Sequence, residues 1–172
     1  MADANTFYAY LDRNAPAQNE YMLTLFNTSA TRKVVIYKII WLTNALTAVT
    51  GVVHDMEIIR ITARTAGTTV TIRSRDSADT LSAGISADNG STSVTEDYTV
   101  LRFIGGSEES PITTTALPTY FGILAQGVVL YAKLPGTKGE TLRQNQGITI
   151  QTNTASTVGV LSFLIEFTDE AA

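Results

Sequence analysis

Cysteine is absent from the 172 residues of this chain. Disulfides, thiol nucleophiles and cysteine-based zinc sites are therefore excluded, and the absence fits a protein made in a reducing cytosol. A chain of this length buries about 70% of its unfolded surface, so the fold needs no covalent or metal cross-link. We expect a single folded domain.

Charged residues are also scarce. They make up 16% of the chain, against about 25% in ordinary domains, while 44% of the residues are hydrophobic. A weakly charged surface suits a protein that docks against others, although a β-rich composition also lowers the charge. The net charge of −4 argues against nucleic acid as a partner, because phosphate binding needs a basic surface.

Long apolar runs are missing as well. None approaches the ~20 residues that a membrane helix needs, and the longest, residues 34–42, is interrupted by Lys38. The first ten residues have neither the basic start nor the apolar centre of a signal peptide. We therefore expect no membrane association.

Helical periodicity is hard to find, and short alternating runs take its place. Thr is the commonest residue and Val and Ile are plentiful, which favours strands. Parallel βαβ units are not expected, because no amphipathic helix separates the apolar runs. The expected fold is all-β: an antiparallel β-sandwich, jelly-roll-like, with eight or nine strands and an N-terminal arm.

The connections follow from the turn residues. Residues 57–64 and 68–75 bracket Thr65-Ala66-Gly67, which predicts a hairpin. Residues 44–55 are predicted to form a connector. Residues 76–95 are predicted to form an exposed loop with a short helical turn near 77–83. Two prolines make residues 112–120 an edge strand or an irregular connection. The remaining strands are expected at residues 20–27, 33–43, 98–104, 127–134 and 147–151, and from residue 157 onward.

Residues 1–18 are interpreted as the arm, and residues 19–172 as the sandwich domain. The arm has no regular alternation, so it either packs against its own core or reaches a neighbouring molecule. In the second case its large apolar side chains are the candidate interface. They are Phe7, Tyr8, Tyr10 and Leu11.

The closing strand is apolar on both faces. Leu161, Phe163, Ile165 and Phe167 fill one face, while Val158, Val160, Ser162 and Leu164 share the other. A strand of this kind is buried on both sides. Either it is central in a covered sheet, or another subunit covers one face.

No catalytic motif is present. The single histidine, His54, cannot form a histidine metal site alone, and no nucleophile motif accompanies it. Carboxylate pairs could serve glycoside hydrolysis, but the candidates cluster in turns, where carboxylates are usually solvated. We expect no enzyme activity, no catalytic residue, no metal and no cofactor. The carboxylate candidates are Asp55, Glu57, Glu96, Asp97, Glu108 and Glu109.

Calcium and sugars are two further ligand classes for which the sequence contains candidate residues. Residues 76–79 and 88–90 come nearest to a calcium loop but do not complete one, so turn chemistry is the ordinary interpretation. Exposed tyrosines could bind sugar, although tyrosines in strands usually bridge core and rim. The tyrosines concerned are Tyr98, Tyr120 and Tyr131.

Three elements together resemble a known family. In outline, residues 20–168 are similar to the small jelly-roll structural proteins of tailed bacteriophages, especially capsid decoration (cement) proteins. No functional residue transfers position by position. The elements are Leu25-Phe26-Asn27-Thr28-Ser29-Ala30 before residues 33–41, the Thr65-Ala66-Gly67 turn, and residues 142–150 before residues 158–168.

The resemblance implies a virion protein made in the host cytoplasm and located on the capsid exterior. Such a protein binds the major capsid protein of the assembled head, often as a trimer, and bridges neighbouring subunits against internal DNA pressure. The alternatives are a collar, neck or tail-associated virion protein, or a carbohydrate- or receptor-binding β-sandwich module. A hydrolase is the third class, and it would need a cleft containing carboxylates of perturbed pKa.

Overall fold

A computed structural model describes residues 5–42, 49–109, 128–153 and 160–172. Strands, turns and irregular segments make up these residues, and none of the elements found in them is a helix. The strands, in chain order, are β1 (Thr6–Asn14), β2 (Glu20–Asn27), β3 (Arg32–Leu42), β4 (Val49–Thr65), β5 (Thr68–Val70), β6 (Ile72–Ser74), β7 (Ile85–Asn89), β8 (Thr92–Glu109), β9 (Val128–Ala132), β10 (Thr141–Leu142), β11 (Gln146–Thr152) and β12 (Leu161–Ala171).

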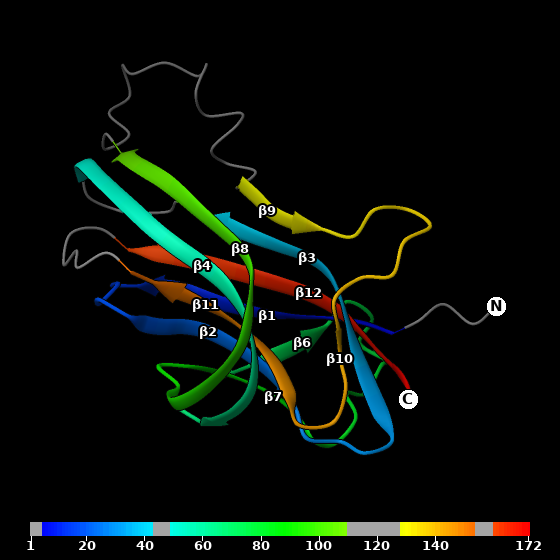
Figure 1. Cartoon of the computed structure of the whole chain (residues 1–172). Helices are drawn as coiled ribbons and strands as arrows, with labels where there is room; N and C mark the ends of the chain where they lie inside the picture. Colours follow the sequence, from blue (N-terminus) through cyan, green and yellow to red (C-terminus); the bar gives the residue numbers. More distant parts are fainter. Residues whose placement is uncertain (1–4, 43–48, 110–127, 154–159) are drawn as a thin grey trace.

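The strands form two antiparallel sheets that pack face to face (Figure 1). Sheet A has the order β10-β3-β12-β1-β6, and β9 also pairs with β3. Sheet B has the order β5-β7-β2-β11-β4-β8. The predicted all-β antiparallel sandwich is therefore confirmed. More strands are present than the eight or nine expected, because β5, β6, β7 and β10 are only two to five residues long.

Eight of the strands form two sets of four neighbours, one set in each sheet. Sheet A contains the neighbours β1, β12, β3 and β9, and sheet B contains the neighbours β2, β11, β4 and β8. The chain therefore crosses from one sheet to the other at most of its connections. The short strands β5, β6 and β7 are inserted between β4 and β8 and extend both sheets at one side of the sandwich.

The core lies between the sheets, and β12 supplies its centre. This strand lies between β3 and β1, and its inward side chains, Leu161, Phe163, Ile165 and Phe167, are almost fully buried. The predicted inward face of the closing strand is confirmed. On the other face Ser162 is also buried, and Leu164 is half-buried. The central position of the strand therefore agrees with the first alternative, a strand inside a covered sheet.

The N-terminal segment predicted as an arm at residues 1–18 packs against its own core, the first of the two alternatives, and does so as a regular strand. Residues 6–14 form β1, which pairs with β12 on one side and β6 on the other. Phe7, Ala9 and Leu11 point into the core. The alternation is hidden in the sequence because Tyr8 and Tyr10, at the outward positions, are aromatic too.

The predicted hairpin around Thr65-Ala66-Gly67 is wrong. Residues 66 and 67 connect β4 to β5, but β4 pairs with β8 and β11, whereas β5 pairs with β7 and β6 pairs with β1. Strand β4 also begins at Val49, within the predicted connector. The predicted loop at 76–95 contains β7 and the start of β8, and its residues 77–83 form turns without a helix. The prediction for residues 112–120 lies outside the described residues.

The position of β1 makes the N-terminal segment essential to the fold. We predict that deleting residues 1–12 unfolds the protein, because the deletion opens sheet A between β12 and β6. The milder change Phe7→Ala should lower the free energy of unfolding by about 3–5 kcal/mol. Urea denaturation, monitored by circular dichroism, measures the stability of both variants. Tyr8→Ala, on the outward face, is the control. A deleted chain that unfolds at the wild-type urea concentration would contradict the assignment.

Candidate functional site

The predicted interface residues of the N-terminal segment do not form one surface. Phe7 is 1% exposed and Leu11 is 7% exposed, and both belong to the core. Tyr8 and Tyr10 are half-buried on the outward face of β1. The Tyr10 hydroxyl donates a hydrogen bond to Asp12 at 2.9 Å, and burial together with this carboxylate raises the pKa of Tyr10. Of the four, only the tyrosines can meet another molecule.

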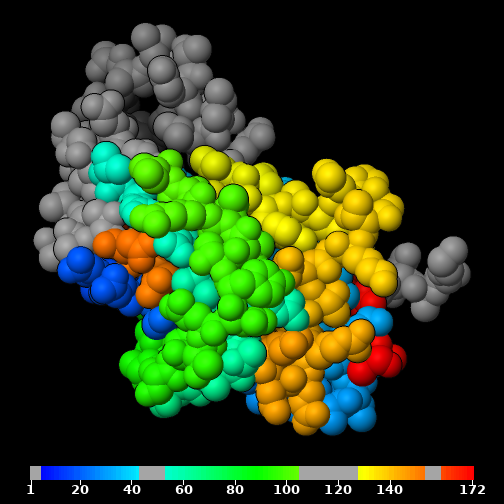
Figure 2. Space-filling model, in the orientation of Figure 1, coloured from blue at the N-terminus to red at the C-terminus, as the bar shows by residue number. Residues whose placement is uncertain are grey.

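Exposed apolar side chains gather on the opposite side of the sandwich. They lie on β4, β8 and β9, where each sheet ends in an edge strand, β8 in sheet B and β9 in sheet A. Figure 2 shows the surface of β8 adjoining that of β9 on one face of the molecule. We call this group the β8–β9 side. Its members are Val53, Leu101, Ile104, Val128 and Val129.

The exposure on the β8–β9 side has a structural cause. Leu101 lies opposite the buried Ile58, and Val128 lies opposite the buried Trp41. Both side chains therefore belong to strand positions that face the core, yet they are 37% and 43% exposed. The rings of Trp41 and Phe103, 6.5 Å apart, bring the two sheets together here. The apolar interior thus reaches the surface between β8 and β9.

The outward faces of the two sheets add apolar surface beside these edges: Val53 and Ile104 lie on that of sheet B, and Val129 lies on that of sheet A. Ile104 is 71% exposed and Val53 is 57% exposed. Val53 is paired with Gly106 and Ile104 with Asp55, so the two side chains are diagonal neighbours across the β4–β8 pair. Sequence reasoning missed this surface because these residues have the composition of core strands. Only the pairing shows that β8 and β9 are edges.

The carboxylates considered for hydrolysis are engaged in ion pairs and hydrogen bonds. Asp55 accepts hydrogen bonds from the Arg102 guanidinium at 2.6 and 3.1 Å, and this partner lowers the pKa of Asp55. Glu57 also lies near Arg102, at 3.6 Å. Glu96 accepts a hydrogen bond from Tyr21 at 2.7 Å. Asp97 lies 3.8 Å from Arg60, and the side chains of Glu108 and Glu109 are outside the described residues.

The residues considered for calcium have other partners. Asp76 accepts a hydrogen bond from the Ala78 amide at 2.9 Å, which is a local turn. Asp88 is buried and pairs with Arg64, whose side chain is 5% exposed. Within the described ranges, no three His, Asp or Glu side chains are grouped as metal ligands would be.

Asp88 and Arg64 fix the chain at one end of sheet B. Asp88 also accepts hydrogen bonds from the Gly67 amide, at 3.1 Å, and from the Ser91 hydroxyl. A β-carbon at position 67 would lie 2.0 Å from the Asn89 carbonyl oxygen, so only glycine fits this turn. The ion pair therefore holds the turn after β4 against the β7–β8 connection.

Two of the three tyrosines that are candidates for sugar binding make hydrogen bonds through their hydroxyls. The Tyr98 hydroxyl donates a hydrogen bond to Glu140 at 3.2 Å, and the Tyr131 hydroxyl accepts one from the Glu140 amide at 2.9 Å. Both residues connect neighbouring elements, as tyrosines at a core rim usually do. Tyr120 lies outside the described residues.

Comparison with known proteins adds no relative. No protein-family model matches the chain, and no curated protein or solved structure is significantly similar to it. No helix among the described residues is long and apolar enough to cross a membrane.

Breaking the Arg64–Asp88 pair should destabilise the fold strongly. Asp88→Asn leaves a buried guanidinium without its counter-ion, which costs about 3–5 kcal/mol of the free energy of unfolding. Replacing both residues, as Arg64→Met with Asp88→Leu, should cost less than Asp88→Asn alone, because no charge stays buried. Urea unfolding of the single and double variants measures this order, and a double variant less stable than the single one would contradict it.

His54 should make stability depend on pH. Its side chain is fully buried on β4, and burial lowers its pKa. The unfolded chain therefore binds a proton at about pH 6.5, before the folded chain does. The stability from the neutral ring is complete above that pH and is lost as the pH falls further. Urea unfolding between about pH 7 and 5 measures this loss of stability. The free energy of unfolding should fall less steeply with pH in His54→Gln than in the wild type, and equal slopes in the two proteins would contradict the assignment.

Proposed function

We propose that this chain is a non-enzymatic structural protein of a bacteriophage virion, a decoration protein that binds the outer surface of an assembled capsid. The observation that carries the proposal is the open, apolar β8–β9 side of the sandwich. An apolar centre with a polar rim is the usual composition of a protein interface. Large exposed apolar patches on a folded domain usually mark such interaction sites.

The strand order supports the family that the sequence resembles. The neighbours β1-β12-β3-β9 and β2-β11-β4-β8 correspond to the two four-stranded sheets of a jelly roll, which has eight strands and two Greek keys. The fold alone does not define a function. The proposal therefore depends on the surface, and the jelly-roll order makes the virion assignment consistent with it.

The physical mechanism is bridging. A protein that binds only the assembled shell stabilises that shell through mass action, and many copies multiply weak contacts through avidity. A trimer would present three β8–β9 sides at once, so that neighbouring major-capsid subunits are linked. The low charge of the chain, 16% of residues, keeps the desolvation cost of such docking small.

The proposal is tested by binding to heads. We predict that the purified chain pellets with undecorated heads assembled from the major capsid protein of the same genome. Ile104→Asp and Val129→Asp should each weaken binding about tenfold or more, because a carboxylate would be buried in the contact. Tyr8→Asp is the control, since the Tyr8 side chain lies on the outward face of sheet A beside the β6 edge, away from the β9 edge.

The outcomes separate the alternatives. A folded wild-type chain that does not bind heads overturns the proposal, and binding to isolated necks or tails would replace it with the neck or tail assignment. Loss of binding in Tyr8→Asp but not in Ile104→Asp would move the contact to the N-terminal strand. Light scattering of the free chain tests the trimer directly.

A further inference from the structure

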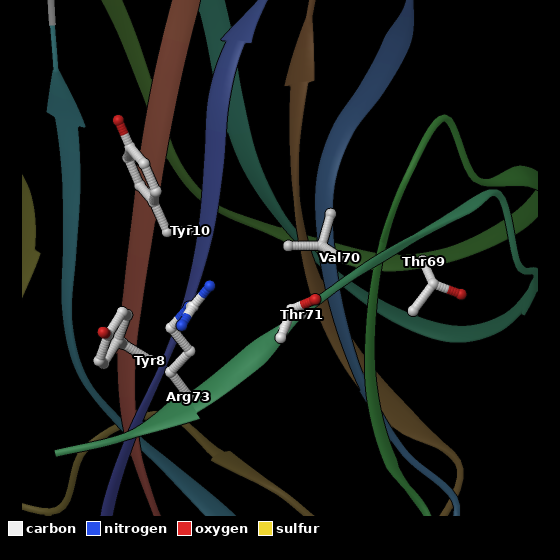
Figure 3. A pocket seen from close by; sticks show the side chains of 6 residues that line it. All are labelled: Tyr8, Tyr10, Thr69, Val70, Thr71 and Arg73. Carbon is white, nitrogen blue, oxygen red and sulfur yellow. The ribbon is translucent and has the colours of Figure 1, made fainter.

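A hollow opens on the side of the sandwich opposite β8 and β9. It has a volume of about 400 Å³ and lies where β5, the edge of sheet B, continues into β6, the edge of sheet A. Figure 3 shows Tyr8 and Tyr10 projecting from the same side of β1. The residues lining the hollow are Tyr8, Tyr10, Thr69, Val70, Thr71 and Arg73.

The side chains around the hollow are held in register by the sheet. Tyr8 lies directly opposite Arg73 in the β1–β6 pair. Tyr8 and Tyr10 are two residues apart on one strand, so their positions are separated by about 7 Å along it. The Arg73 side chain extends beside β1 toward the level between the two tyrosines (Figure 3). The Thr69 and Thr71 side chains lie near the opposite wall of the hollow.

Arg73 is the charged group of the hollow. Among the residues that the structure describes, no carboxylate forms an ion pair with it. The nearby carboxylates have other partners: Glu166 pairs with Arg75 at 2.9 Å, and Asp12 accepts a hydrogen bond from Tyr10. The exposed Arg73 guanidinium, which lines the hollow together with the two tyrosines, therefore keeps its capacity to bind an anion in a planar, two-point manner.

We propose that this hollow binds a carboxylate-bearing saccharide, such as a uronic acid unit of an acidic glycan. The tyrosine rings offer apolar faces for the C–H face of a sugar ring, and Arg73 offers a partner for the carboxylate. The hydroxyls of Thr69, Thr71 and Tyr8 can both donate hydrogen bonds to sugar hydroxyls and accept them. An acidic peptide fits less well, because the neighbouring edge strand β6 has only three residues for main-chain pairing.

The position of the hollow gives the site a use beyond capsid binding. Sheet A ends in β6 on this side and in β9 or β10 on the other. A molecule docked through the β8–β9 side would therefore leave the hollow free. A glycan-binding site there would face outward from the particle. The saccharide test uses the isolated chain, so its result is independent of whether the chain binds heads.

The probe is a tetrasaccharide of alternating glucuronate and N-acetylglucosamine, added to the isotope-labelled chain and followed by nuclear magnetic resonance. The neutral tetramer of N-acetylglucosamine and tetraglutamate are the comparison ligands. We expect saturable binding of the acidic saccharide, with shifts at residues 8–10 and 69–73. The neutral saccharide should bind about tenfold more weakly, since it lacks the charge-assisted hydrogen bonds to Arg73.

Three variants test which residue recognises the carboxylate and which recognises the sugar ring. Arg73→Gln should weaken the acidic saccharide about tenfold and leave the neutral one unchanged. Tyr8→Leu, which keeps an apolar side chain on β1, should weaken both. Arg143→Gln, an exposed arginine in the turn between β10 and β11, is the matched control and should change neither.

Several results would overturn the proposal. These are no saturable binding at millimolar saccharide, shifts confined to other residues, or an Arg73→Gln variant that binds the acidic saccharide as well as the wild type does. Tetraglutamate binding as tightly as the acidic saccharide would show a general anion or peptide site instead. Each variant is first checked for the wild-type circular dichroism spectrum.

Discussion

The inward face of β12 is the constraint on which the rest of the structure depends. Phe163, Ile165 and Phe167 are fully buried between the two sheets, and the ring of Phe167 stacks on Phe7 of β1 at 5.9 Å. This strand needs a partner on each side, which β3 and β1 supply. The N-terminal strand is therefore part of the core.

The two sides of the sandwich differ in how the edges of sheet A and sheet B meet. On one side the chain crosses directly from β5 to β6, so sheet B and sheet A are covalently joined, and a polar hollow lies over the junction. On the other side β8 and β9 are the edges of sheet B and sheet A, and core-facing residues such as Leu101 and Val128 are partly exposed. Unpaired, apolar edges are a liability that proteins normally cover. The proposed docking function would cover this edge and would leave the polar side free for a second ligand.

The sequence predicts local elements well and long-range pairing poorly. The strand Glu20–Asn27 and the inward residues of β12 follow from alternation, which is a local signal. The hairpin predicted after Thr65 failed because pairing is decided by distant strands: β4 pairs with β8, and β5 pairs with β7. The exposed positions of the candidate site depend on which strands are edges. The Arg64–Asp88 pair joins residues that are far apart in the chain, and neither residue alone shows that it will be buried.

The central claim is that the chain docks through its open side and presents the closed side outward. Hydrogen–deuterium exchange of the chain, free and bound to heads, tests this most directly. The account predicts that binding slows exchange in peptides from β8 and β9, while peptides covering β1 and residues 69–73 exchange as in the free chain. Slower exchange at β1 and residues 69–73, with β8 and β9 unchanged, would contradict it.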